Sequence, residues 1–253
     1  MKHALLILFA GVSLSVAMTA TPSTPVSQIK KVKWKKVGKK KGRKQTVWKV
    51  KKAKAFVFEA GMTIDADGSP KTYHPRNKGL DTNANGKYKG RWVSVVTIGR
   101  RPYIQKQSDP APGYYVSTTS LQDPAKKKTD PARYVDSEKI PYIALPQKLL
   151  ATGGEPVAGR AQLGDIALVI NTNNGKKSFA VVADRGPSFH LGEGSIALAR
   201  SLGINANARK GGIGKGIVYI VFPGSGDGRP KSVARINHYG EQLQDKWGKQ
   251  LGL

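Results

Sequence analysis

The sequence contains no cysteine among its 253 residues. This absence excludes disulfide bonds, thiolate nucleophiles and cysteine-ligated metals, so the apolar core alone must hold the folded chain together. Acidic residues are also scarce, with 16 Asp and Glu against 43 Lys and Arg, and the formal net charge is +27. A charge so far from zero indicates a polyanionic partner or surface.

Histidine is equally rare, and no pair of the four histidines has the spacing of zinc ligands. We therefore expect no metal site and no other cofactor. The four positions are His3, His74, His190 and His238.

Long apolar runs are confined to the first 20 residues. A short basic start, an apolar stretch from Ala4 to Val16 and small residues up to Ala20 are typical of a secretory signal peptide. The run is shorter than the roughly 20 residues that span a membrane, and no second run follows it. We expect cleavage after residues 1–20 and a secreted, periplasmic or cell-wall-associated protein without a transmembrane segment.

Basic residues concentrate just after this segment. Residues 30–54 contain 14 of the 43 Lys and Arg and none of the acids, and they offer few apolar side chains. We therefore expect residues 21–54 to be a disordered tail that binds an anionic cell-wall polymer or surface, without specific nucleic-acid recognition. The alternative is a linker that only increases solubility. Residues 55–253 then form one domain, which we expect to be monomeric.

Short β-branched and aromatic runs between turn residues dominate residues 55–253, so we predict a mainly β fold, most simply a small barrel. Only residues 194–203 and 239–250 show a helical pattern, the first with Ser195 as its cap. The expected strands are residues 55–62, 91–99, 113–121, 140–146, 165–171, 178–184 and 216–224.

Two carboxylates stand out in the stretch VVADRGPSFHLGEGSIALARSLG. Asp184 ends an expected strand, and alternation places it on the face of Ala180 and Val182. Glu193 follows nine positions later, between two glycines, so the loop can fold it back towards Asp184. Glycoside hydrolysis uses such a pair, one carboxyl as acid and the other as base or nucleophile. The alternative makes Asp184 a turn residue and Glu193 a charge before the helix.

Several segments resemble the family 75 glycoside hydrolases, the fungal-type chitosanases. Among them are MTIDADGSPKTYHP and GDIALVINTNNGKKSFAVVADRGPSFHLGEGSIALARSLGI, and the likeness covers about residues 55–250. The resemblance implies an endo-acting enzyme that hydrolyses β-1,4 bonds between glucosamine units with inversion. It also implies that Asp184 and Glu193 are the catalytic pair, with their individual roles open.

The segment VVADRGP before a short helix is also similar to double-psi β-barrel proteins, among them lytic transglycosylase-like cell-wall proteins. This likeness implies a small six-stranded double-psi-type barrel with one or two short helices. Two alternative functions stay open, a peptidoglycan-directed lytic transglycosylase-like enzyme and a wall-binding protein without catalysis.

Chitosan is a polycation, so a basic chain needs local acids to bind it. Asp65 and Asp67 are candidate ligands for the sugar amines, and Tyr73 and His74 are candidate sugar-contacting residues. The alternative is that these residues only form a polar turn. Asp81 is a further available acid.

Overall fold

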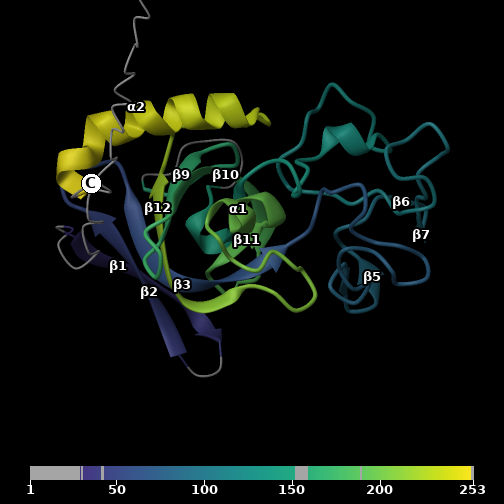
Figure 1. Cartoon of the computed structure of the whole chain (residues 1–253), viewed down its shortest axis with the longest axis horizontal. Coiled ribbons are helices and arrows are strands. Elements are labelled where there is room, and N and C mark those ends of the chain that lie inside the picture. Colours follow the sequence, from purple (N-terminus) through teal and green to yellow (C-terminus); the bar gives the residue numbers. More distant parts are fainter. Residues whose placement is uncertain (1–28, 30, 41–42, 152–158, 189, 252–253) are drawn as a thin grey trace, which may run out of the picture.

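The computed structural model describes residues 29–251 except 30, 41–42, 152–158 and 189 (Figure 1). The predicted signal peptide therefore lies outside the described residues. Within the described part, no helix combines the length and apolarity that a bilayer crossing requires. The strands are β1 Lys31–Lys40, β2 Arg43–Val50, β3 Phe56–Asp65, β4 Lys87–Tyr88, β5 Arg91–Trp92, β6 Thr97–Ile98, β7 Arg101–Pro102, β8 Tyr142–Pro146, β9 Ile166–Asn171, β10 Lys177–Gly186, β11 Glu193–Ser195 and β12 Ile213–Phe222, and the α-helices are α1 Ile196–Ser201 and α2 Val233–Leu251.

Six of these strands close into a barrel in the order β3, β11, β8, β10, β9, β12, with β12 returning to pair with β3. The pairs β3 with β11 and β8 with β10 are parallel, and the others are antiparallel. The prediction of a mainly β protein built on a small six-stranded barrel is confirmed. Five of the seven expected strands contribute to it, whereas the three-residue strand β11 falls where the sequence predicted only a loop and a helix start.

The barrel interior is filled by alternating apolar side chains, such as Phe58, Val169 and Val182. Helix α2 covers the outer face of β9 and β10 (Figure 1), where its residue Ile236 packs on Val181. Gly240 allows this close approach, because a Cβ there would lie 2.2 Å from the Phe179 ring.

Both expected helices are present. Ser195 caps α1 by accepting a hydrogen bond from the backbone N–H of Leu198, as predicted. Helix α2 begins six residues earlier than the sequence pattern indicated and is not short. Its start is set by Ser232, whose hydroxyl accepts a hydrogen bond from the N–H of Arg235, and by Ile236, which reaches the barrel.

The expected strands at residues 91–99 and 113–121 do not join the barrel. They lie in a long excursion, residues 66–141, which carries the short hairpins β4–β5 and β6–β7 (Figure 1). Val96 and Val116 pack with Tyr134 in a small separate cluster, so these apolar residues bury one another beside the barrel. The sequence pattern showed that these residues are buried, but it did not show in which core they pack.

Residues 31–50 differ from the disorder expected for residues 21–54. Strands β1 and β2 form an antiparallel hairpin, and β2 pairs with β3 at Trp48 and Lys49. Val47 is fully buried in the barrel core, and Val50 joins the cluster under α2. This segment has too few apolar residues to build a core of its own. It can still dock on an existing core, because each apolar side chain that packs there removes its surface from water.

Candidate active site

The two predicted catalytic carboxylates lie on the two strands that flank β8. Asp184 of β10 and Glu193 of β11 both pair with the same residue, Ala144. Residues opposite each other in a sheet point to the same face, so the two carboxylates lie in one row across three strands. Gly194, the next residue, faces Met62 and Leu198 in the core, which places Glu193 on the outer face.

A bulge in β10 turns Asp184 to that face. Val182 pairs with Ile143 and Asp184 with Ala144, so Ala183 is an extra residue. The prediction that Asp184 shares the face of Val182 is therefore wrong. Regular alternation would have directed the carboxylate towards the barrel core, where an ionised group is very unfavourable.

Asp184 is held by three hydrogen-bond donors on a single oxygen. Its Oδ1 accepts from the Ser120 hydroxyl at 2.6 Å, from the Ser120 backbone N–H at 3.0 Å and from the Arg185 backbone N–H at 2.7 Å. Among the described residues, no donor hydrogen-bonds its Oδ2. This second oxygen is therefore the one available for proton transfer.

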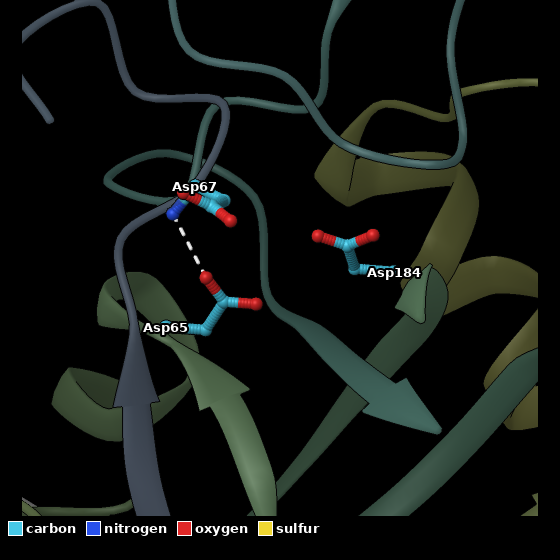
Figure 2. A group of neighbouring side chains, drawn as sticks. All are labelled: Asp65, Asp67 and Asp184. Carbon is cyan, nitrogen blue, oxygen red and sulfur yellow. Dashed lines mark hydrogen bonds between the residues drawn. The ribbon is translucent and has the colours of Figure 1, made fainter. Parts of the chain in front are cut away.

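Two further carboxylates come from the end of β3. Asp65 is the last residue of that strand, and its Oδ1 accepts the backbone N–H of Asp67 at 2.8 Å, which closes a tight turn (Figure 2). The turn continues through Gly68, whose φ is +80° and whose Cβ would lie 2.1 Å from the Val135 carbonyl oxygen. Carboxylate oxygens of Asp65, Asp67 and Asp184 all lie within 4.8 Å of one another.

The close carboxylates raise one another's pKa. For Asp65 the pKa is well above 3.8, first because the side chain is buried and then because of the charges of Asp67, Glu193 and Asp184. Burial and the Asp184 charge likewise raise the pKa of Asp67. Burial also raises the pKa of Asp184, against the opposing effect of the Ser120 and Arg185 donors. Such a group shares protons and attracts a cation, either an ammonium group or a metal ion.

The four acids lie along an open groove between the barrel and the excursion. Two adjoining cavities of about 900 and 310 Å³ share Asp65, Asp67, Asn85, Pro187 and Glu193 in their walls. Ser120 and Asp184 line the larger cavity. An extended polymer can therefore pass over the carboxylates.

Charge differs between the two ends of the groove. The described walls of the smaller cavity include Asp81 but no Lys or Arg. The larger cavity also has Lys87, Lys128 and Arg185 in its walls. A strongly basic chain thus presents an acidic floor here, with no Lys or Arg among the described wall residues of the smaller cavity.

The candidate sugar-contacting residues lie differently from the expectation. Tyr73 lines the smaller cavity, but only 2% of its surface is exposed, and its hydroxyl donates to Asp67 Oδ1 at 2.7 Å. It therefore orients a carboxylate and does not offer its ring to a sugar. His74 is absent from the described walls of both cavities, and its ring packs edge-on against Tyr114.

Sequence reasoning missed Ser120, which lies 64 positions from Asp184. It also missed Ser117, which donates to Asp67 Oδ1 at 3.3 Å. Both serines fall in the segment interpreted as a strand, and no local pattern marks them. Only the path of the excursion brings them over the groove.

Glycines shape the loop that joins the two catalytic candidates. A Cβ on Gly186 would lie 2.7 Å from Glu193 Oε2, so this position leaves space for the carboxylate. Gly192 has a φ of +91° and its Cβ would lie 2.3 Å from the Gly61 carbonyl oxygen. Gly192, next to Glu193, is therefore packed closely on β3.

Comparison with known proteins agrees with this geometry. A search of curated proteins finds no match to the chain. The sequence profile of a family described as fungal chitosanase of glycosyl hydrolase group 75 matches residues 62–250, about three quarters of the chain. That range includes Asp65, Asp67, Asp184 and Glu193 and excludes the hairpin β1–β2. The chain belongs to the fungal chitosanases of glycosyl hydrolase group 75.

Proposed function

We propose that this glycoside hydrolase cleaves the β-1,4 bonds between glucosamine units of chitosan at internal positions, with inversion. Membership of the chitosanase family supports the reaction class and the polymer. The row formed by Asp184, Ala144 and Glu193 carries the mechanistic proposal.

The width of that row is compatible with inversion. Neighbouring strands lie about 4.8 Å apart, so the backbones of Asp184 and Glu193 are separated by about 10 Å. Inverting enzymes hold their two carboxyl groups roughly 6.5–9.5 Å apart to admit a water molecule, whereas retaining enzymes need roughly 5–5.5 Å. The open groove leaves space for the sugar linkage and that water.

We assign Asp184 as the base and Glu193 as the acid. Three donors on Oδ1 of Asp184 stabilise its ionised form, and the Arg185 charge acts in the same direction. Burial opposes them and raises the pKa of Asp184, as it does for Asp65 and Asp67. The base role therefore rests on the hydrogen-bond geometry, in which Oδ1 is held by donors and Oδ2 is the oxygen that accepts the proton of water.

Asp65 and Asp67 then bind the ammonium groups of the substrate. Oδ1 of Asp65 accepts from its own turn and Oδ1 of Asp67 accepts from Tyr73, and both residues line the two cavities of the groove. An ammonium ion placed among them lowers the mutual repulsion that raises their pKa values. This local acidity offsets the repulsion between a basic chain and a cationic polymer.

Substitution of the pair tests the proposal. Asp184→Asn and Glu193→Gln should each lower the release of reducing ends from chitosan by about 10²–10⁴-fold, because each removes one proton-transfer group. Melting curves should stay close to the parent. Asp245→Asn and Glu241→Gln, on the exposed face of α2, are the matched controls. Normal activity in Asp184→Asn or Glu193→Gln would refute the assignment, and NMR of the first product anomer decides inversion.

A second function is favoured by the cations of the larger cavity. Lys87, Lys128 and Arg185 suit an anionic or N-acetylated glycan better than a fully cationic one. A peptidoglycan-directed lytic enzyme would release products with anhydro ends from cell-wall sacculi. Mass analysis of products from chitosan and from sacculi separates the two functions.

We further propose export, on the pattern of residues 1–20, and contact of the basic N-terminal region with an anionic wall polymer. Lys51, Lys52 and Lys54 are exposed beside the hairpin. Replacing these three lysines by Gln should weaken retention on anionic polymer beads at low salt and have little effect at high salt. Equal retention of both proteins at low salt would contradict this binding.

A further inference from the structure

The hairpin β1–β2 touches the catalytic loop. Gln45 of β2 accepts the backbone N–H of Leu191 through its Oε1 at 2.9 Å and donates its Nε2–H to the Leu191 carbonyl at 3.4 Å. One side chain therefore satisfies both backbone groups of a residue 146 positions away. Leu191 lies two residues before Glu193.

We propose that Gln45 is a positioning residue that holds residues 190–192, and through them Glu193, in the geometry needed for hydrolysis. The inference rests on the proposed role of Glu193. The hairpin lies outside the residues matched by the family profile. Through Gln45 it would nevertheless contribute to catalysis.

The loop is fixed on its other sides, so Gln45 completes its support. The Leu191 side chain is buried in the barrel core, which also receives Val47 from the hairpin. The next residue, Gly192, accepts the backbone N–H of Thr63 at 2.8 Å. The Thr63 hydroxyl lies 3.2 Å from His190 Nε2. Strand β3 and the core thus hold one edge, while Gln45 alone reaches both backbone groups of Leu191 among the described residues.

Loss of Gln45 would leave the Leu191 N–H without this acceptor in a buried position. A buried donor without a partner is strongly unfavourable, so the loop would move to find water or another acceptor. Pro187 and His190 of this loop line the groove, and Gly186 lies against Glu193 Oε2. A shift of the loop would therefore displace the carboxylate. Misplacement of a reacting group by about 1 Å can cost about 100-fold in rate.

The test compares Gln45→Met with Thr46→Val in the full chain. Met keeps the length of the side chain and removes both hydrogen bonds, whereas Thr46 is the next residue of the same strand and has no hydrogen bond to the loop among the described contacts. Gln45→Met should lower kcat on chitosan about tenfold or more, with KM nearly unchanged because Asp65 and Asp67 stay in place. Thr46→Val should retain the parent kcat.

Hydrogen exchange gives a readout that is independent of activity. The Leu191 amide should exchange faster in Gln45→Met than in the parent, because its acceptor is gone. Gln45→Glu keeps an acceptor for that amide and should restore part of kcat, which also decides the matter if Gln45→Met fails to fold.

An unchanged kcat in folded Gln45→Met would overturn the proposal, and so would an equal loss in Thr46→Val. A normal kcat in Glu193→Gln would instead refute the proposed function, while the exchange rate at Leu191 would still report on the contact.

Discussion

Removal of the Ser120 hydroxyl is predicted to shift the pH dependence of catalysis. The hydroxyl donates to Asp184 Oδ1 at 2.6 Å, and Ser120→Ala deletes only this bond, since the backbone N–H of residue 120 remains. A hydrogen bond to a charged group contributes roughly 1.5–3 kcal/mol. Because two donors stay on Oδ1, we expect the lower end of that range.

A loss of about 1.5 kcal/mol corresponds to about one pKa unit, since one unit equals about 1.36 kcal/mol. The lost bond stabilised the ionised form, so the pKa of Asp184 rises. If Asp184 is the base, the acid limb of kcat/KM moves up by about one unit and activity below that limb falls about tenfold.

The assay is the pH profile of reducing-end release from chitosan, with Ser188→Ala as the matched control. Ser188 lines the same cavity and has no hydrogen bond among the described contacts. An acid limb that stays in place would refute the role of Ser120. Movement of the alkaline limb instead would show that Asp184 is the acid, contrary to our assignment.

Two further substitutions test the electrostatics and the space of the site. Burial raises the pKa of Asp65 above 3.8. Above pH 3.8 the native state therefore binds more protons than the unfolded chain. The stability of the native state then falls as the pH rises through the native pKa. Asp65→Asn should therefore increase Tm by a few °C at neutral pH, with the gain shrinking towards about pH 4; scanning calorimetry that finds the same gain at both pH values would contradict this. Gly186→Ala places a methyl group 2.7 Å from Glu193 Oε2 and should lower kcat about tenfold with a nearly unchanged melting curve, whereas Gly214→Ala, which meets no atom within 4 Å, should be normal. Equal kcat values for these two glycine variants would show that Glu193 tolerates the crowding.

Much of the barrel could be predicted from local patterns. Alternating apolar runs bounded by turn residues identified five of its strands, and Ser195 before an apolar helical face identified α1. The same patterns failed at residues 91–99 and 113–121, because alternation reports that one face is buried but not against which partner. They also failed at residues 31–50. Strand β2 packs Val47 and Val50 on cores that other strands form, so this segment needs no core of its own.

For the site, the sequence supplied the acids, and the structure decided how they face one another. The candidate pair and the DADG turn could be found because carboxylates beside glycines and strand ends are visible locally. The bulge at Ala183, which turns Asp184 outward, leaves no sign in the alternation pattern. Asp184 accepts hydrogen bonds from Ser120, and the backbone N–H of Leu191 donates to Gln45; these partners are 64 and 146 positions away.

The sequence by itself thus determined the strand-rich fold, the cysteine-free and basic character of the chain, and the nine-residue spacing of its catalytic candidates. Only the tertiary structure gathered Asp65 and Asp67 with that pair in one groove and attached the basic hairpin to the catalytic loop. The reason is physical. Local propensities act over a few residues, whereas barrel closure fixes which distant side chains share a face and which buried backbone groups they must satisfy.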